Sequence, residues 1–178
     1  MGFELNDLTG TIPQNIFNIT SLQVLDLTGN SLSGNLPLDT WISCPNLEIL
    51  RLGANKISGH IPSYLSNFSS LLDIDFSVNF LSGHIPRNLG NLKNLKYLGL
   101  AENQLTTEPG HQGHSFLLSL TNCRFLEEPH LSFNPLNITI LDAIGKFSLS
   151  LKVFDASETY RPHSGDWRDC KDCFLMRT

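Results

Sequence analysis

A chain of 178 residues, 40% hydrophobic and 16% charged, has the length and composition of one folded domain and argues against disorder. The formal net charge of -5, without basic residues interleaved with aromatic ones, argues against nucleic acid as a partner. No apolar run approaches the roughly 18 to 20 residues that cross a bilayer, and no secretory signal pattern is visible. The sequence therefore predicts no membrane contact by this segment itself.

One sequence unit recurs along the chain at intervals of 24, 25, 24, 24, 31 and 25 residues. Each unit has an asparagine in the pattern N-x-[LI], and Thr159 stands in the last, degraded slot. A fixed period of this length is typical of solenoid proteins, in which neighbouring units stack and share one core. The asparagines are Asn6, Asn30, Asn55, Asn79, Asn103 and Asn134.

Apolar residues before each asparagine predict a short strand per unit, because L-x-L points both leucines inward and the residue between them to solvent. In chain order these segments are residues 25–27, 50–52, 74–76 and 98–100, followed by 129–131 and 154–156. Pro129 cannot donate a ladder hydrogen bond, so its repeat should be the weakest. Parallel stacking of these strands would bury the leucines of every unit against those of its neighbours.

The asparagines and glycines of the unit have structural explanations. A side-chain amide both donates and accepts, so stacked asparagines should form a ladder that satisfies backbone groups where the chain turns inward. Glycine and then Ile-Pro or Leu-Pro follow the asparagine in most units, which favours a fixed backbone geometry there.

The combined unit L-x-x-L-x-L-x-x-N-x-L-[ST]-G-x-[IL]-P resembles the plant-specific leucine-rich repeats of receptor-like serine/threonine kinases and receptor-like proteins over residues 1–105. Residues 104–157 resemble part of the ectodomains of the flagellin- and elongation-factor-sensing branch. The resemblance implies an α/β repeat fold, a right-handed solenoid with a parallel sheet on the concave face and an irregular or 3-10 convex side. A cysteine-bearing N-terminal cap is missing, so we interpret the chain as a truncated piece of a longer ectodomain.

The spacing divides the chain into a solenoid over residues 1–157 and a non-repeat tail over 158–178. The interval of 31 residues predicts an enlarged loop at 106–117. The tail contains Cys170 and Cys173, a pair for which redox and zinc roles are both weaker explanations than a disordered segment. The sequence predicts no metal site and no cofactor.

Ligand binding should use the solvent-facing positions of the strands, because these build one extended surface. The candidates that combine charge with an aromatic anchor are Asp26, Glu48, Arg51, Asp75 and Tyr97. Acceptor sequons for N-glycosylation begin at Asn18, Asn67 and Asn137. Asn18 and Asn67 share one place in the unit with Asn91 and Asn122, which lack the Ser or Thr; an asparagine recurring there also has a structural explanation.

The resemblance implies a recognition module for a protein or peptide ligand, with a co-receptor as second partner, located at the cell surface in the parent receptor. The alternative is a free-standing secreted inhibitor or decoy protein. The chain has no kinase glycine-rich loop, no H-R-D and no D-F-G, so it is not expected to be an enzyme.

Overall fold

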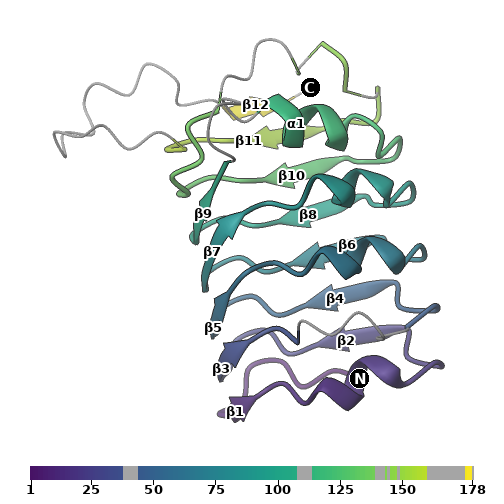
Figure 1. The fold of residues 1–178 in the computed structure, drawn as a ribbon, viewed down its shortest axis with the longest axis vertical. Helices are drawn as coiled ribbons and strands as arrows, with labels where there is room; N and C mark the ends of the chain where they lie inside the picture. The colour runs from purple at the N-terminus through teal and green to yellow at the C-terminus, as the bar shows by residue number, and fades with distance from the viewer. Residues whose placement is uncertain are drawn as a thin grey trace, which may run out of the picture.

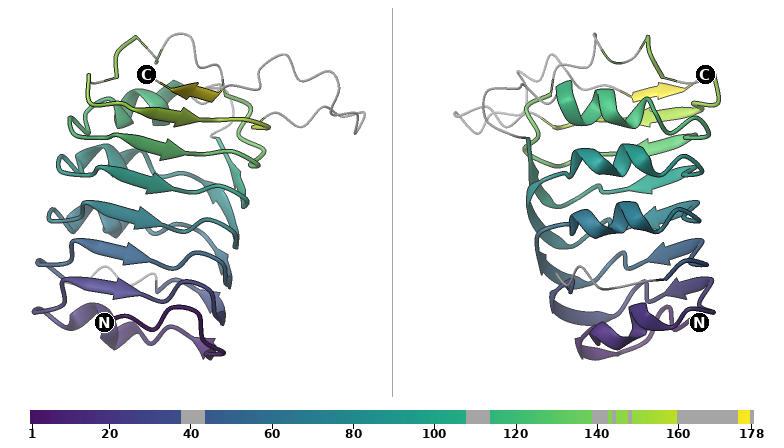
Figure 2. Two further views of the ribbon diagram at one scale, coloured as in Figure 1. Left: turned by 180° about the vertical axis from the view of Figure 1, so that it is seen from behind. Right: turned by 45° about the vertical axis from the view of Figure 1, so that its right-hand side comes forward.

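The computed structural model describes residues 1–37, 44–107, 114–138, 143, 145–147, 149–159 and 175–177. Successive coils stack along one axis, from the purple N-terminal coil at one end to the yellow-green coils at the other (Figure 1). Each described coil after the first contributes a strand to a large sheet on one side. On the opposite side several coils carry a short helix, which the right-hand view of Figure 2 shows in front. The predicted leucine-rich repeat solenoid is therefore confirmed.

Seven strands of the described chain form the large sheet, in the order β12-β11-β10-β8-β6-β4-β2. All neighbours except the β11–β12 pair run parallel, and the register places Leu25, Leu50, Ile74 and Leu98 side by side. The sheet therefore aligns the equivalent position of every coil. The strands are β2 (Val24–Asp26), β4 (Ile49–Arg51), β6 (Asp73–Asp75), β8 (Tyr97–Gly99), β10 (Glu128–His130), β11 (Val153–Asp155) and β12 (Leu175–Arg177).

A second, small sheet lies beside the large one and was not predicted from the sequence. Its order is β1-β3-β5-β7-β9, with every pair parallel. These strands contain the segments that follow the asparagines. Each of the first four ends at or near the glycine of the repeat, for which the sequence predicted only a fixed backbone geometry. They are β1 (Thr9–Thr11), β3 (Ser31–Asn35), β5 (Lys56–Gly59), β7 (Phe80–His84) and β9 (Gln104–Thr106).

Short helices form the side opposite the large sheet. Three are 3-10 helices that begin directly after the recurring proline: η1 (Gln14–Asn18), η2 (Ser63–Asn67) and η3 (Arg87–Asn91). The fourth is α1 (His114–Leu120). The predicted loop over residues 106–117 is wrong in its last part. Phe116, Leu117 and Leu120 are buried there at helical spacing, so an apolar face packs residues 114–120 as a helix.

Inward leucines of all coils form one continuous core. Leu25, Leu50 and Leu98 are fully buried, as is Phe154 near the far end of the stack. Each buried leucine contributes about 1.5–3 kcal/mol relative to an exposed one. Since a coil alone cannot cover these side chains, stability is shared between neighbours.

Pairing weakens where Pro129 interrupts the pattern. The β8–β10 pair has three registered positions, whereas β10–β11 has one, His130↔Asp155. Pro129 is buried at the centre of β10 and has no N–H to donate. The ladder is therefore shortest on the side of β10 that faces β11.

The C-terminal boundary of the solenoid and the tail that follows it differ from the prediction. Thr159 is buried, and its backbone oxygen accepts from Asn137 N at 2.9 Å, so the solenoid extends past residue 157. Residues 175–177 form β12, which pairs antiparallel with β11, so the prediction of a disordered tail is wrong there. A strand at this place satisfies backbone groups that β11 would otherwise leave unpaired.

Cys170 and Cys173 lie outside the described residues. No helix in the described ranges has the length and apolarity of a membrane span.

Candidate functional site

Each coil turns from the large sheet to the small one through the same backbone conformation. The residue before each asparagine has a positive φ, as in Ala54 (51°), Val78 (57°) and Phe133 (54°). In one coil this residue is a glycine, Gly29, with φ 69°. The left-handed conformation tightens the turn and aims the asparagine inward. A repeated turn keeps the ends of the strands level, so their outward side chains share one surface.

The asparagine side chains join adjacent coils at this turn. Asn79 Nδ2 donates to Phe76 O of its own coil at 3.2 Å and to Leu52 O of the preceding coil at 3.0 Å. Asn79 Oδ1 accepts from Ile57 N at 2.9 Å. Asn30, Asn55, Asn103 and Asn134 make the equivalent bonds, while Asn6 at the open end bonds only within its own coil.

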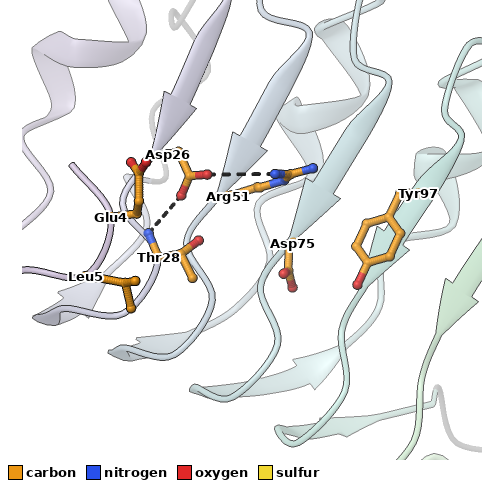
Figure 3. A pocket seen from close by; sticks show the side chains of 7 residues that line it. All are labelled: Glu4, Leu5, Asp26, Thr28, Arg51, Asp75 and Tyr97. Carbon is orange, nitrogen blue, oxygen red and sulfur yellow. Dashed lines mark hydrogen bonds and ion pairs between the residues drawn. The ribbon is translucent and has the colours of Figure 1, made fainter. Parts of the chain in front are cut away.

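An open hollow of about 360 Å³ lies on the solvent-facing side of the large sheet, toward the N-terminal end (Figure 3). Side chains from five neighbouring coils line it, and we call it the sheet hollow. Its volume is at the lower end of the range for ligand pockets. The lining residues are Glu4, Leu5, Asp26, Thr28, Arg51, Asp75 and Tyr97.

Arg51 crosses the strands and is held by carboxylates on both sides. Its Nε donates to Asp73 Oδ1 at 3.2 Å, its Nη2 pairs with Asp73 Oδ2, and its Nη1 lies 3.9 Å from Asp26 Oδ2. The hydrogen bond with Asp73 and the neighbouring carboxylates raise the pKa of the Arg51 guanidinium, so it stays charged. The positive charge of Arg51 is therefore already matched within the protein.

Asp26 and Asp75 each use one carboxylate oxygen to accept a hydrogen bond from the backbone. Asp26 Oδ1 accepts from Thr28 N at 3.0 Å, and Asp75 Oδ1 accepts from Ser77 N at 2.9 Å. No donor among the described residues bonds to Asp75 Oδ2. A Cβ on Gly99 would lie 2.5 Å from Asp75 Oδ1, so Gly99 leaves the space that the carboxylate occupies.

Tyr97 forms the wall of the sheet hollow farthest along the stack. Burial and the nearby carboxylates of Asp75, Asp73 and Glu128 raise the pKa of Tyr97 to about 12, so its hydroxyl is neutral at physiological pH. Its ring lies 5.4 Å from the ring of His130, which in turn lies 3.8 Å from Glu128 Oε2 and from Asp155 Oδ2. The acidic character of the face therefore continues past the hollow.

The structure brings together four of the five candidates from the sequence, namely Asp26, Arg51, Asp75 and Tyr97. Glu48 is exposed and precedes β4, outside the lining of the hollow. Sequence reasoning did not select Asp73 as a site residue, although it bonds to Arg51, nor Glu4 and Leu5 from the incomplete first coil. Asp73 is outward and pairs in register with Ile49, so it lies diagonally across from Arg51 on the neighbouring strand, which was a usable signal for the pair.

The sequon asparagines lie away from the large sheet or at a turn. Asn18 and Asn67 are the last residues of η1 and η2, and both are exposed. Asn91 ends η3 in the same place. Asn137 is exposed with φ 46°, and the Thr139 of its sequon lies outside the described residues. Within the described ranges, no group of three metal-ligating side chains gathers.

Comparisons with known proteins agree with this architecture. The sequence model of the Leucine Rich Repeat family matches residues 21–41 and 46–68. The chain is 34% identical over 129 residues to the calmodulin-binding receptor kinase CaMRLK of Arabidopsis thaliana, covering 71% of this chain and 18% of that protein. It spans only 6% and 11% of two further curated relatives, both receptor-like proteins.

Two solved structures from Arabidopsis thaliana extend the similarity to the backbone. The ectodomain of the receptor kinase SOBIR1 is 33% identical with a TM-score of 0.66, covering 76% of this chain and 69% of that one. The ectodomain of the receptor kinase HAESA, solved with a peptide hormone ligand, is 30% identical with a TM-score of 0.73. That match covers 88% of this chain and 25% of the HAESA chain.

Proposed function

We propose, on the premise that this chain belongs to the leucine-rich repeat ectodomains of plant receptor kinases, that it recognises a protein or peptide ligand through the outer face of its large sheet. The observation that carries the proposal is the sheet hollow, where charged groups and an aromatic wall from five coils converge. Such convergence gives a ligand several anchors in one place. The peptide hormone bound in the HAESA structure supports a peptide as the ligand class.

Placement in the parent receptor follows from the same family. The relatives are ectodomains of plant membrane receptors, so the solenoid would face the cell exterior, and a co-receptor would be its second partner. Within the family, we place the chain in the flagellin- and elongation-factor-sensing branch because of the resemblance of residues 104–157. Titration calorimetry with purified bacterial flagellin and elongation factor tests this branch. Binding to one of them supports it, and no heat with either rejects the branch alone.

A peptide-display selection tests the recognition face. A random library of 12-residue peptides is selected on the intact chain, and the enriched peptides are measured against Tyr97→Ala and against Asn88→Ala, a substitution in η3 on the opposite side. We expect Tyr97→Ala to weaken binding at least tenfold and Asn88→Ala to leave it unchanged. Peptides that bind all three proteins equally, or a selection without enrichment, would refute a ligand site on the large sheet.

A further inference from the structure

The charges inside the sheet hollow are not balanced. Glu4, Asp26 and Asp75 each bring a carboxylate to the lining, and Arg51 brings the positive charge. Asp73, which lies outside the lining, already takes two nitrogens of the Arg51 guanidinium. Asp73, outside the hollow, therefore neutralises Arg51, and a net negative charge remains inside the hollow.

Asp75 is the carboxylate best placed to act on a ligand. Ser77 N holds its Oδ1, which fixes the orientation of the group, while Oδ2 has no donor among the described residues. Asp75 is half-buried. Gly99, its partner on β8, and Gly53, two residues past the end of β4, lie close to its carboxylate and have no side chain to cover it. An oriented, partly desolvated carboxylate binds a cation more strongly than a freely moving one on the surface.

Two further groups of the hollow fit a long cationic side chain. Tyr97, on the strand next to Asp75, presents an aromatic ring, which attracts a cation and packs against a methylene stem. Thr28 Oγ1, shielded from solvent, has no hydrogen-bond partner in the described part of the chain and lines the same hollow. A donor from a ligand would satisfy this oxygen, since an unpaired buried polar atom is unfavourable.

We propose that the sheet hollow is a specificity pocket for a basic side chain, arginine or lysine, of an extended peptide ligand. The inference rests on the proposed recognition function and assigns the chemistry of one ligand residue. Asp75 binds the charged head, Tyr97 packs against its stem, and Asp26 and Glu4 add attraction at the rim. The negative charge disfavours acidic ligand residues at the same place.

N-acetyl-arginine amide is the probe, and N-acetyl-citrulline amide is its neutral control of nearly the same shape. Binding is followed by NMR shifts of the protein amides in the intact chain. We expect the arginine probe to shift amides of β6 and β8, at residues 73–75 and 97–99, and the citrulline probe to bind at least fivefold more weakly. Raising the salt concentration should weaken the arginine probe only.

Matched variants separate the pocket from general attraction to an acidic protein. Asp75→Asn keeps an oxygen for Ser77 N and should weaken the arginine probe about three- to fivefold, the range for a partly exposed ion pair. Glu48→Gln removes an equal charge from the same face outside the hollow and should change nothing. Equal binding of both probes, equal loss in the two variants, or no binding of the arginine probe would overturn the pocket. Peptides selected on the face but lacking basic residues would overturn it as well, while leaving the proposed recognition function intact.

Discussion

Asparagine at the turn of each coil satisfies backbone groups of two coils at once. Asn79 bonds to four backbone groups at 2.9–3.3 Å and is 7% exposed. Removing its amide leaves the buried Ile57 N–H without a partner, while Leu52 O and Phe76 O each lose one of two donors. At about 1–3 kcal/mol for an unsatisfied buried group, Asn79→Ala should lower the free energy of unfolding by about 2 kcal/mol. Urea denaturation measures this.

Asn6 is the matched control, because it is exposed and donates only to Phe3 O and Glu4 O of its own coil. We expect Asn6→Ala to lower the free energy of unfolding by less than about 1 kcal/mol. Equal losses in the two variants would contradict the role of the bonds between coils.

The residue before each asparagine gives a second test at this scale. Val78 holds φ 57°, a conformation that costs a β-branched residue about 1–2 kcal/mol, whereas glycine loses about 0.5–1 kcal/mol through chain entropy. Val78→Gly should therefore raise the free energy of unfolding by about 0.5–1 kcal/mol. Gly29→Val, at the same place two coils earlier, should lower it by more than about 1 kcal/mol. Thermal unfolding compares both, and shifts of the same sign would reject the explanation.

At the scale of the element, the shortened β10–β11 ladder traces to one proline. Pro129→Leu restores an N–H and the side chain that most other coils have at this position, so we expect about 1 kcal/mol of added stability. Leu98→Pro, at the residue paired with Pro129 in β8, should remove at least as much. Urea midpoints of both variants provide the measurement. A destabilised Pro129→Leu would mean that the neighbouring packing, and not the missing donor, limits this repeat.

The 3-10 helices present two sequon asparagines in equivalent, exposed places. Asn18 and Asn67 end η1 and η2, and neither side chain has a hydrogen-bond partner among the described residues. After secretion from plant cells, peptide mass spectrometry should find glycans on both asparagines and none on Asn91, which lacks the hydroxyl residue. Asn18 and Asn67 without glycans in the secreted protein would contradict this proposal.

The strands of the large sheet were predictable because L-x-L combines a period of two with a fixed spacing between coils. The small sheet was not, because Ser31–Asn35 and its equivalents contain glycine and polar residues that are typical of turns. Their strands form only because stacking brings equivalent backbones level. Likewise, α1 was not predicted within the long interval between Asn103 and Asn134, because its three buried apolar residues are too few to identify a helix by periodicity alone.

The site was predictable to the extent that it follows the repeat. Alternation along the strands identifies Asp26, Arg51 and Asp75 as outward residues, and alignment of the coils places them side by side. Which of these charges is already matched was not predictable, since it depends on the Arg51 guanidinium turning toward Asp73. Glu4 and Leu5 were missed because the first coil lacks most of its strand.

At the scale of the whole molecule, every coil depends on the next for its buried leucines and for its turn hydrogen bonds. The surface for ligands exists only because this dependence holds the strands at a constant spacing. The stack should therefore unfold with strong coupling between neighbouring coils, with the open N-terminal coil exchanging first.

Native-state hydrogen exchange tests the stacked-coil account most directly. The amides of Leu32, Ile57, Leu81 and Leu105 each donate to the asparagine oxygen of the following coil. We predict that these amides are strongly protected, at intervals of 24 or 25 residues, while those of the exposed strand Thr9–Thr11 exchange much faster. If the four amides exchange as fast as the Thr9–Thr11 amides, the coils are not stacked through the asparagine ladder, and the recognition face built on it does not exist.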